Sequence, residues 1–470
     1  MPTLPPSPAQ DAILRDLTRE LAARYPQSAA RCDRRRVALL DQTSHAVRWN
    51  EPFMVTVARC DGAAIHELGG ARLIDYWQGH FANLLGHNPP LVRAALQATL
   101  AEGRGLQSGM LHDVEHEFAE LLVQRTGTET LRFTTSGALA TFYAVLLARG
   151  FTGRRAVVKA AGGWHGSQPF ALKGVAARAG SFDHLESEGL PGSTQDDVEL
   201  CGYNDAASLE RVFERRGGEV ACVILEPWLG AGGGIGATPE FLRAARELSA
   251  RHGALLIHDE IIAGFRFRAG DLSAMYGIRP DLLVLGKVIG GGMPVAAVCG
   301  RRDVMALASR AMRRVKFEGG TYSAHELSLV AGLTMVRHLV GHEAEIYPAL
   351  ARRGATLRDG LERIARELRL PAWISGWPNE VVAGSSVCHV RFGRDRGGRP
   401  LRPEETGGPG AAHPVVGEDL LRAALLLEGL SVHNGLGAAS TAHGEAELRA
   451  TLVGYRRALE RLVAAGAFAG

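Results

Sequence analysis

The stretch ALLIHDEIIAGFRF (254–267), followed by PDLLVLGKVIGGGMPVAAVCG (280–300), contains two apolar runs that each lead into charged residues. The first run ends at Asp259-Glu260, and the second delivers Lys287 between glycines. Short runs that are apolar on both faces are typical of strands in a parallel sheet covered on both sides. Such sheets build their sites at the carboxyl ends of the strands, where these charged residues fall.

Similar apolar runs alternate with helical patterns from about residue 90 to 335. The expected strands are LRFTT (131–135), AVVKA (156–160), VACVILE (220–226), ALLIHDE (254–260), LLVLG (282–286) and PVAAVCG (294–300). Helical patterns lie between many of them, for example at 140–150 and 239–253. This alternation predicts an α/β fold with a mainly parallel sheet in a long central domain. A short strand, ARLIDYW (71–77), precedes it.

The regions on either side of this central domain have different sequence patterns. Residues 9–40 have a polar, Arg-rich helical pattern, from which we expect a solvent-facing lead-in. Helices at 344–368 and 446–465 surround a weaker strand signal at VCHVRF (387–392), which suggests a smaller α+β domain. Two stretches break the pattern: 181–200 is polar and strand-free, and 392–417 is rich in Gly and Pro. Long loops of this kind are functional lids or disordered insertions, and the sequence leaves both open.

Composition excludes several classes of protein. The 470 residues carry a formal net charge of +3, with 46% hydrophobic residues, which argues against wholesale disorder and gives no case for binding nucleic acid or a membrane surface. No apolar run is long enough for a transmembrane helix, and the start lacks the pattern of a secretory signal. The six cysteines lack CxxC spacing, so we expect free thiols, a cytoplasmic protein and no zinc site.

Three features at predicted strand ends carry chemistry. In TTSGALA (134–140) a strand ends and a helix begins near Gly137, so backbone N–H groups and Ser136 could hold an anion, although an ordinary Ser-capped turn reads the same way. Asp259 could pair with a protonated nitrogen, or form a salt bridge to Arg266 or Arg268.

Lys287 is the third feature. The chain has only four lysines (Lys159, Lys173, Lys287 and Lys316), and the other three lack a comparable glycine-flanked strand end. A desolvated lysine becomes a nucleophilic amine suited to Schiff-base chemistry, whereas a surface lysine would have no such role. An amine, an acid and an anion cradle are together what pyridoxal phosphate requires. Trp164, in GWHG (163–166), could stack on the pyridine ring.

The run LLIHDEIIAGFR…GIRPDLLVLGKVIGGGMPVAAVCGRRDVM closely resembles the signature of class III pyridoxal-phosphate-dependent aminotransferases, in particular the glutamate-1-semialdehyde 2,1-aminomutase-like branch. The similarity extends through ARLIDYWQGHFANLLGHNPPLV (71–92), ILEPWLGAGG (224–233), GGTYSAHELSLVAG (319–332) and STAHGEAEL (440–448), and thus over about residues 45–450. It implies fold type I, with a seven-stranded large domain and a smaller α+β domain. The expected division is 1–70 as an N-terminal segment, 71–340 as the large domain and 341–470 as the small domain.

The resemblance also implies residue roles around the cofactor ring. Lys287 would form the Schiff base and move protons during transamination. Asp259 would pair with the pyridine nitrogen, and Ile261 and Trp164 would pack on opposite ring faces. His165 and Glu226 would belong to the shell of residues close to the cofactor.

At the phosphate, the resemblance assigns Ser136 and the backbone N–H groups of Gly137 and Ala138. Thr321 would reach the phosphate of the neighbouring subunit, which implies a homodimer. The family usually carries a hydroxyl where this chain has Ala138. A hydrogen bond to a charged group contributes roughly 1.5–3 kcal/mol, so the cofactor affinity would be reduced unless Ser136 or Thr135 compensates.

The reaction expected from the resemblance is amino-group transfer from an amino-acid or amine donor to an oxo acceptor. The intramolecular alternative is the aminomutase reaction. Arg48 lies near, but out of register with, an arginine that faces the substrate carboxylate in aminomutases, and loop 430–439 lacks their acidic residue; both differences favour the aminotransferase. Further expected substrate residues are His45, Trp77 and His80, with the loop 392–417.

Two rivals come from other classes of protein. A cofactor-bearing but catalytically idle regulator is suggested by the altered phosphate turn, although Lys287 and Asp259 argue against it. A nicotinamide oxidoreductase would need a strand-associated GxGxxG motif followed by an acid, which this sequence lacks.

Overall fold

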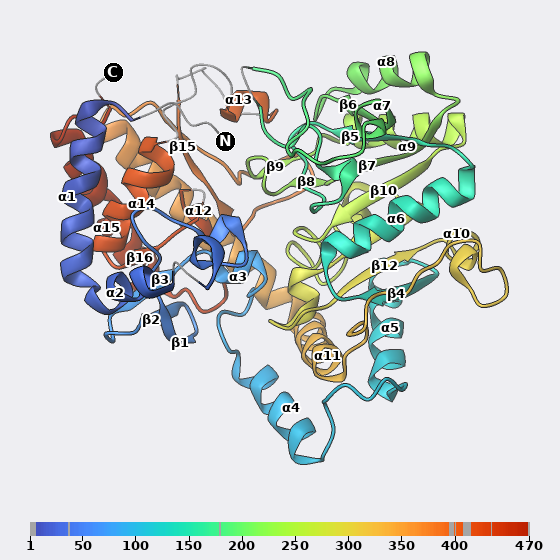
Figure 1. Cartoon of the computed structure of the whole chain (residues 1–470), viewed down its shortest axis with the longest axis horizontal. Coiled ribbons are helices and arrows are strands. Elements are labelled where there is room, and N and C mark those ends of the chain that lie inside the picture. The colour runs from blue at the N-terminus through green and yellow to red at the C-terminus, as the bar shows by residue number, and fades with distance from the viewer. Residues whose placement is uncertain are drawn as a thin grey trace.

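The computed structural model describes residues 6–35, 38–177, 180–393, 399, 401–407, 415–433 and 435–468. In this part of the chain a seven-stranded sheet has the order β4-β12-β11-β10-β7-β5-β6, and only β12 runs antiparallel to its neighbours (Figure 1). Its strands are β4 (Thr130–Thr134), β5 (Ala156–Ala160), β6 (Val198–Cys201), β7 (Val220–Leu225), β10 (Leu255–Glu260), β11 (Leu282–Leu285) and β12 (Ala296–Gly300). The predicted α/β fold with a mainly parallel sheet is therefore confirmed.

Helices cover both faces of this sheet because successive strand residues point to opposite sides. On one face Ile257 and Val284 pack against α6 (Gly137–Thr152). On the other face Val223 and Leu256 pack against α8 (Ala206–Arg216) and α9 (Pro239–His252). Further along that second face lie α5 (Asp113–Thr126) and α11 (Glu326–Gly341). The two-sided burial explains why the strands are apolar throughout.

A second hydrophobic core joins the start and the end of the chain (Figure 1, left). Strands β1 (Val57–Asp61), β2 (Ala64–Glu67) and β3 (Arg72–Asp75) form an antiparallel sheet that β16 (Leu430–Ser431) extends by pairing parallel with β3. The helices of this core are α1 (Pro8–Arg24), α2 (Pro26–Arg35), α12 (Glu343–Glu367), α14 (Leu421–Leu427) and α15 (Glu445–Ala464). The division at residues 70 and 340 stays a prediction; β3, which it assigns to the large domain, pairs with a strand from the C-terminal part.

The remaining elements are short or connect these two cores. They are α3 (Gln78–Phe81), α4 (Pro90–Ala101), α7 (Ser193–Asp197), α10 (Arg302–Met305), α13 (Glu404–Gly407), β8 (Trp228–Leu229), β9 (Ile235–Gly236), β13 (Ala372–Ile374), β14 (Val387–Cys388), β15 (Val390–Phe392) and β17 (Gly437–Ala438). Single-turn helices lie at Leu40–Gln42, Ala46–Arg48, Pro169–Ala171, Ser273–Tyr276, Lys287–Gly290 and Ala306–Ala308, and a π-helix at Val415–Leu420.

Two expectations about flanking segments are wrong. The N-terminal helical segment is not merely solvent-facing, because Leu17 and Leu21 of α1 are fully buried against the second core. The stretch 181–200 is not strand-free, because β6 begins within it and forms an edge of the main sheet. Parts of the loop 392–417 lie outside the described residues. In the described part, the Leu401 carbonyl accepts a hydrogen bond from the side chain of Asn204, which lies between β6 and α8.

No helix in the described ranges has the length and apolar character needed to cross a membrane. The same ranges hold no cluster of three or more His, Cys, Asp or Glu side chains suited to a metal ion. All six cysteines are free thiols.

Candidate active site

Lys287 lies directly after β11, beyond Gly286, and begins the single-turn helix Lys287–Gly290. Its φ of 47° is in the left-handed region, which a non-glycine residue adopts at an energetic cost and which clusters at functional sites. Burial lowers the pKa of Lys287 to about 8, while the charges of Asp259 and Glu226 act to raise it. No hydrogen bond or ion pair joins the amine to another described residue, so it is free to react.

Asp259 is brought next to Lys287 by strand pairing. It belongs to β10, opposite Val284 in the register of β11, and is 3% exposed. Its Oδ1 accepts a hydrogen bond from the Ile261 N–H (3.0 Å), and its Oδ2 lies 2.8 Å from His165 Nδ1. One oxygen is thus held by the backbone and the other by an imidazole.

The alternative of a salt bridge from Asp259 to an arginine is overturned. Arg266 instead donates to the carbonyl oxygens of Ile262 and Phe81, and Arg268 contacts Asp271. Among the described residues, His165 is therefore the only ionisable side chain within hydrogen-bond distance of Asp259.

His165 is fully buried. It lies in the loop that follows β5, and its ring reaches Asp259 from there. Its carbonyl oxygen accepts a hydrogen bond of 2.6 Å from Thr141 Oγ1 on α6, which ties the loop to the helix. Burial lowers the pKa of His165, and Asp259 opposes that shift. The ring is therefore neutral at ordinary pH, and the contact with Asp259 assigns its proton to Nδ1.

The predicted phosphate turn begins α6. Ser136 is the N-cap, and its Oγ accepts a hydrogen bond from the Leu139 N–H (3.3 Å). The N–H groups of Gly137 and Ala138 have no hydrogen-bond partner in the described part of the chain, as expected for the open start of a helix that binds an anion. A Cβ built on Gly137 would lie 2.4 Å from Ile261 Cδ1, so only glycine allows this close approach.

Glu226 positions the loop that carries Trp164. Its Oε1 accepts from the Trp164 N–H and its Oε2 from the Gly230 N–H, both at 2.9 Å. Burial raises the pKa of Glu226 to about 8, and the nearby charge of Asp259 adds to the shift. The Trp164 side chain is 37% exposed and so remains accessible for stacking.

Thr321 is exposed and follows a glycine pair that packs against the phosphate turn of its own chain. The Thr135 N–H donates to the Gly319 carbonyl at 3.3 Å. The Thr321 carbonyl accepts a 2.8 Å hydrogen bond from Gln107 Nε2. Its contact with a neighbouring subunit stays a prediction.

The four expected substrate residues do come together. The ring of His80 lies 4.9 Å from that of His45 and 4.6 Å from that of Trp77, measured between centroids. Arg48 Nε is 3.4 Å from His80 Nε2. Burial lowers the pKa of His80 to about 4, and the charges of His45, Arg48 and Lys287 contribute. This group therefore lies on the same side of the site as the reactive amine.

His80 is carried by an unusual backbone. Gln78, Gly79, His80 and Phe81 all have φ between 47° and 69°, so α3 is a single left-handed turn. Left-handed helix costs roughly 1–2 kcal/mol per non-glycine residue, so the surroundings must hold the turn in place.

Two charged side chains hold this turn at its ends. Asp75 accepts hydrogen bonds from the N–H groups of Trp77 (3.3 Å) and Gln78 (2.8 Å), and its Oδ2 lies 2.9 Å from His87 Nε2. At the other end the fully buried Arg266 donates to the Phe81 carbonyl. The turn is thus tied both to the N-terminal sheet and to the segment after β10.

Sequence reasoning missed residues that complete this region. The ring of His433 stacks on Trp77, with centroids 4.8 Å apart and planes 8° from parallel. Burial, the histidine His80 and two arginines lower the pKa of His433 to about 3. The sequence signal was weak because Asp75, Arg266 and His433 are distant in the chain and belong to no compact motif.

The family comparisons agree with this geometry. The model of the family described as aminotransferase class-III matches residues 45–376. The chain belongs to the class III aminotransferase family. A curated relative, glutamate-1-semialdehyde 2,1-aminomutase of Caldivirga maquilingensis, is 39% identical over 287 residues, which cover 61% of this chain and 66% of the relative. The chain thus spans about two thirds of that relative's length.

Solved structures match this class III aminotransferase over nearly its whole length. An omega-transaminase from Sphaerobacter thermophilus has a TM-score of 0.83 at 30% identity, covering 92% of this chain and 97% of the other. A β-phenylalanine aminotransferase from Variovorax paradoxus has a TM-score of 0.82 at 29% identity, covering 97% and 98%. A transaminase with pyridoxal phosphate bound has a TM-score of 0.81 at 28% identity, covering 94% and 99%. These structures confirm fold type I and point to an enzyme that uses pyridoxal phosphate.

The residues present fit this cofactor. Lys287 offers an amine without a partner, and Asp259 offers a buried carboxylate whose two oxygens are already oriented. The start of α6 offers N–H groups without hydrogen-bond partners, and Gly137 leaves open the space that a Cβ would occupy there. The individual roles of these residues stay predictions.

Proposed function

We propose that this class III enzyme is an aminotransferase that moves an amino group from an amino-acid or amine donor to an oxo acceptor, with Lys287 as the amine that condenses with pyridoxal phosphate. The observation that carries the proposal is the placement of the unpartnered Lys287 amine beside the Asp259–His165 pair at neighbouring strand ends. When bound, the cofactor supplies an aldehyde and a conjugated ring that accepts the electrons of the Cα–H bond.

Lys287 has two tasks in this reaction. Its Nζ would hold the cofactor through the aldehyde, and once freed by the substrate amine it would serve as the base that accepts the substrate Cα proton and later gives it back. A lysine of ordinary pKa would be protonated near neutrality and unable to accept a proton. Burial reduces that obstacle, because it brings the pKa to about 8 and so raises the deprotonated fraction of the amine near neutrality.

Asp259 would keep a proton on the ring nitrogen of the bound cofactor. A carboxylate facing that nitrogen stabilises its charged form, which makes the ring a better electron acceptor. His165 donates to Oδ2 and the Ile261 N–H donates to Oδ1, so Asp259 cannot rotate away. We assign His165 as a positioning residue that acts through Asp259.

The aminomutase is the second candidate. It is favoured by the 39% identity to a protein named glutamate-1-semialdehyde 2,1-aminomutase. The whole-length similarity to an omega-transaminase and to a β-phenylalanine aminotransferase favours the intermolecular reaction instead.

A half-reaction experiment decides between the two. The purified enzyme is converted to its pyridoxamine-phosphate form and given glutamate-1-semialdehyde alone. An aminotransferase releases no 5-aminolevulinate in this experiment. In its pyridoxal-phosphate form, however, amino donors change the absorbance of the enzyme, and an oxo acceptor reverses that change. Release of 5-aminolevulinate in many turnovers establishes the mutase.

The Lys287→Ala variant tests the shared chemistry. It should retain the fold and lose turnover by several orders of magnitude, whereas Lys316→Ala, an exposed lysine, should behave as the wild type. Borohydride reduction of the holoenzyme followed by peptide mapping should place the label on Lys287. A label on another lysine, or no binding of the coenzyme, contradicts the proposal.

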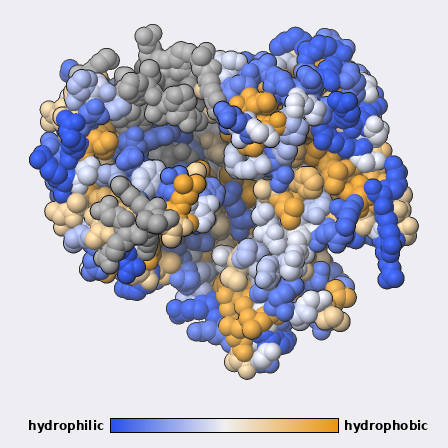
Figure 2. Space-filling model, in the orientation of Figure 1, coloured by the Kyte–Doolittle hydropathy of each residue, from blue (hydrophilic) through white to orange (hydrophobic). Residues whose placement is uncertain are grey.

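We also propose that the enzyme is a homodimer in which Thr321 reaches the partner's phosphate. An apolar surface supports the proposal: Leu106, Met110 and Leu111 are each at least 75% exposed, and Leu100 at the end of α4 is 48% exposed. Figure 2 shows hydrophobic side chains gathered over this end of the molecule, at the bottom of the view. Gln107 of the same segment contacts Thr321. Exposed apolar patches of this kind mark association surfaces.

A further inference from the structure

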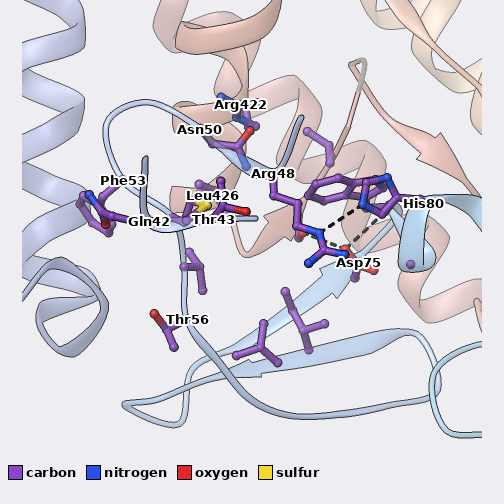
Figure 3. A pocket seen from close by; sticks show the side chains of 18 of the residues that line it. Gln42, Thr43, Arg48, Asn50, Phe53, Thr56, Asp75, His80, Arg422 and Leu426 are labelled. Atoms are coloured by element: carbon purple, nitrogen blue, oxygen red, sulfur yellow. Dashed lines mark hydrogen bonds between the residues drawn. The ribbon is translucent and has the colours of Figure 1, made fainter. Parts of the chain in front are cut away.

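Two buried lysines have no part in the proposed reaction. They lie outside the cavity in which Arg48 contacts His80 (Figure 3). Lys159, near the end of β5, is fully buried, and Lys173 is 5% exposed. Lysine is rarely buried, because taking its charge out of water is costly unless partners compensate. The partners of these two side chains therefore show what each of them does.

Lys159 is held by the loop that follows its own strand. Its Nζ donates to the carbonyl oxygens of Ala171 (3.0 Å) and Lys173 (2.6 Å), which are both buried residues. Neither carbonyl accepts another hydrogen bond in the part of the chain that the structure describes. Burial lowers the pKa of Lys159 to about 7, while the charges of Glu226 and Glu186 act to raise it. The amine thus satisfies two buried acceptors that would otherwise be left unpaired.

These two contacts close the loop 161–174. An outgoing limb leaves β5, the chain makes the single turn Pro169–Ala171, and a returning limb follows the turn. The Gly162 N–H of the outgoing limb donates to the Gly174 carbonyl of the returning limb at 2.9 Å. The two limbs therefore lie side by side, and Lys159 fastens the returning limb to the main sheet.

The outgoing limb carries two groups that the proposed reaction uses. These are the Trp164 ring, expected to stack on the cofactor, and His165, whose Nδ1 lies 2.8 Å from Asp259 Oδ2. The limb is also tied by the Trp164 N–H to Glu226 and by the His165 carbonyl to Thr141. Because the two limbs are paired, a shift of the returning limb would be passed on to both groups.

We propose that Lys159 is a positioning residue of the active site, whose amine holds the loop closed and thereby keeps His165 on Asp259 and Trp164 at the place of the cofactor ring. The inference rests on the proposed function, from which the roles of these side chains come. Lys159 touches neither substrate nor cofactor and acts only through the loop.

Lys173 provides a matched control. Its Nζ also donates to two carbonyl oxygens, those of Gln195 (2.9 Å) and Val198 (2.8 Å), and it forms an ion pair of 3.1 Å with Asp183. It thus fastens α7 and the start of β6 instead of the returning limb. Lys159→Met and Lys173→Met therefore remove the same group from similar surroundings but release different segments.

Kinetics and the absorbance of the holoenzyme test the active-site role. We expect Lys159→Met to lower kcat roughly 10- to 100-fold, the cost of moving a positioned group by about an ångström, with little change of KM for the amino donor. The absorbance spectrum of the bound cofactor should shift, because the hold on Asp259 is loosened. Lys173→Met should keep the wild-type kcat and spectrum, even where it melts at a lower temperature.

A conservative variant guards against a loss of folding. Lys159→Gln keeps an N–H donor on a shorter side chain, so its kcat and spectrum should lie between those of the wild type and Lys159→Met. Circular dichroism and thermal melting show whether each variant is folded. If Lys159→Met does not fold, every comparison is made with Lys159→Gln.

A double-variant cycle shows whether Lys159 acts through His165. His165→Phe removes the contact with Asp259 and should itself lower kcat. If the loop transmits the effect, adding Lys159→Met to His165→Phe should lower kcat far less than Lys159→Met does alone, because the contact it protects is already gone. Effects that multiply in full would show independent roles and overturn the inference.

Amide hydrogen exchange in the apoprotein separates the inference from the cofactor chemistry. Peptides from 161–174 should exchange faster in Lys159→Met, and peptides from 183–198 in Lys173→Met, each relative to the wild type. Unchanged exchange in 161–174, or faster exchange without a change of kcat and spectrum, overturns the positioning role and leaves the proposed function intact. A wild-type protein that does not bind pyridoxal phosphate instead contradicts the proposed function, and the inference with it.

Discussion

At the residue scale, the reactivity of Lys287 is governed by where its amine lies. Burial depresses its pKa to about 8, and Asp259 partly opposes this by favouring the protonated form. The amine is therefore increasingly deprotonated as the pH rises through about 8, well below the range of an exposed lysine.

This predicts a pH dependence that can be measured without cofactor. In the apoprotein, the rate of Lys287 modification by an amine-reactive reagent, followed by peptide mass spectrometry, should reach half its maximum near pH 8. Asp259→Asn removes the charge that raises the pKa, so its midpoint should fall below that of the wild type. The exposed Lys316 serves as the internal reference. An unchanged or higher midpoint in Asp259→Asn would contradict the assignment.

The sequence allowed only part of this site to be predicted. Lys287 and Asp259 could be expected at adjacent strand ends, because each follows an apolar run and parallel strands end at one edge. The partner of Asp259 could not be predicted. His165 is 94 residues away and reaches Asp259 only because its loop is fastened to α6, whereas the nearby Arg266 and Arg268 turn to other carbonyl and carboxylate groups.

At the element scale, the left-handed turn Gln78–Phe81 fixes the orientation of His80 among the other expected substrate residues, His45, Arg48 and Trp77. Gly79 has a φ of 61°, and a Cβ there would lie 2.9 Å from Asn83 Nδ2. The turn therefore depends on glycine both for its backbone and for its contact with Asn83.

Gly79→Ala tests that dependence. We expect it to lower the free energy of unfolding by about 1 kcal/mol or more and to raise KM for the amino donor at least several-fold, because His80 is displaced. Gly103→Ala is the control: its φ is 74° and nothing lies within 4 Å of a Cβ there, so only stability should change. Chemical denaturation and steady-state kinetics measure the two effects. A Gly79→Ala enzyme with unchanged KM would show that the turn does not shape the substrate site.

Elements of the fold differ in how far the sequence could predict them. The inner strands β5, β7, β10 and β11 follow the predicted ranges within a residue, because burial on both faces leaves a continuous apolar run. β6 was missed because it is a short edge strand with the partly exposed pair Glu199-Leu200. The left-handed turn leaves no periodic pattern, since tertiary contacts hold it.

At the scale of the whole molecule, the apolar surface at 100–111 predicts how the enzyme assembles. In sedimentation equilibrium we expect twice the chain mass of 50.2 kDa. Met110→Glu/Leu111→Glu places two charges on this surface and should produce monomers. Because Thr321 would then lack a partner phosphate, cofactor affinity should fall as well.

The control for assembly is Val453→Glu, a half-exposed position on α15 away from this surface. It should remain dimeric with normal cofactor binding. A wild-type protein that sediments as a monomer, or a double variant that stays dimeric, would argue against the proposed interface.

The pairing of β3 with β16 has a consequence for synthesis on the ribosome. Asp75 and its hydrogen-bond partner Ser431 are 356 residues apart in the chain. At about 5–20 residues per second, the early strands emerge on the order of 20 to 70 seconds before the strand that completes them. During that interval the edge of β3 is open to wrong pairing, so a nascent chain of this protein should be a client of chaperones that shield unpaired strands until translation ends.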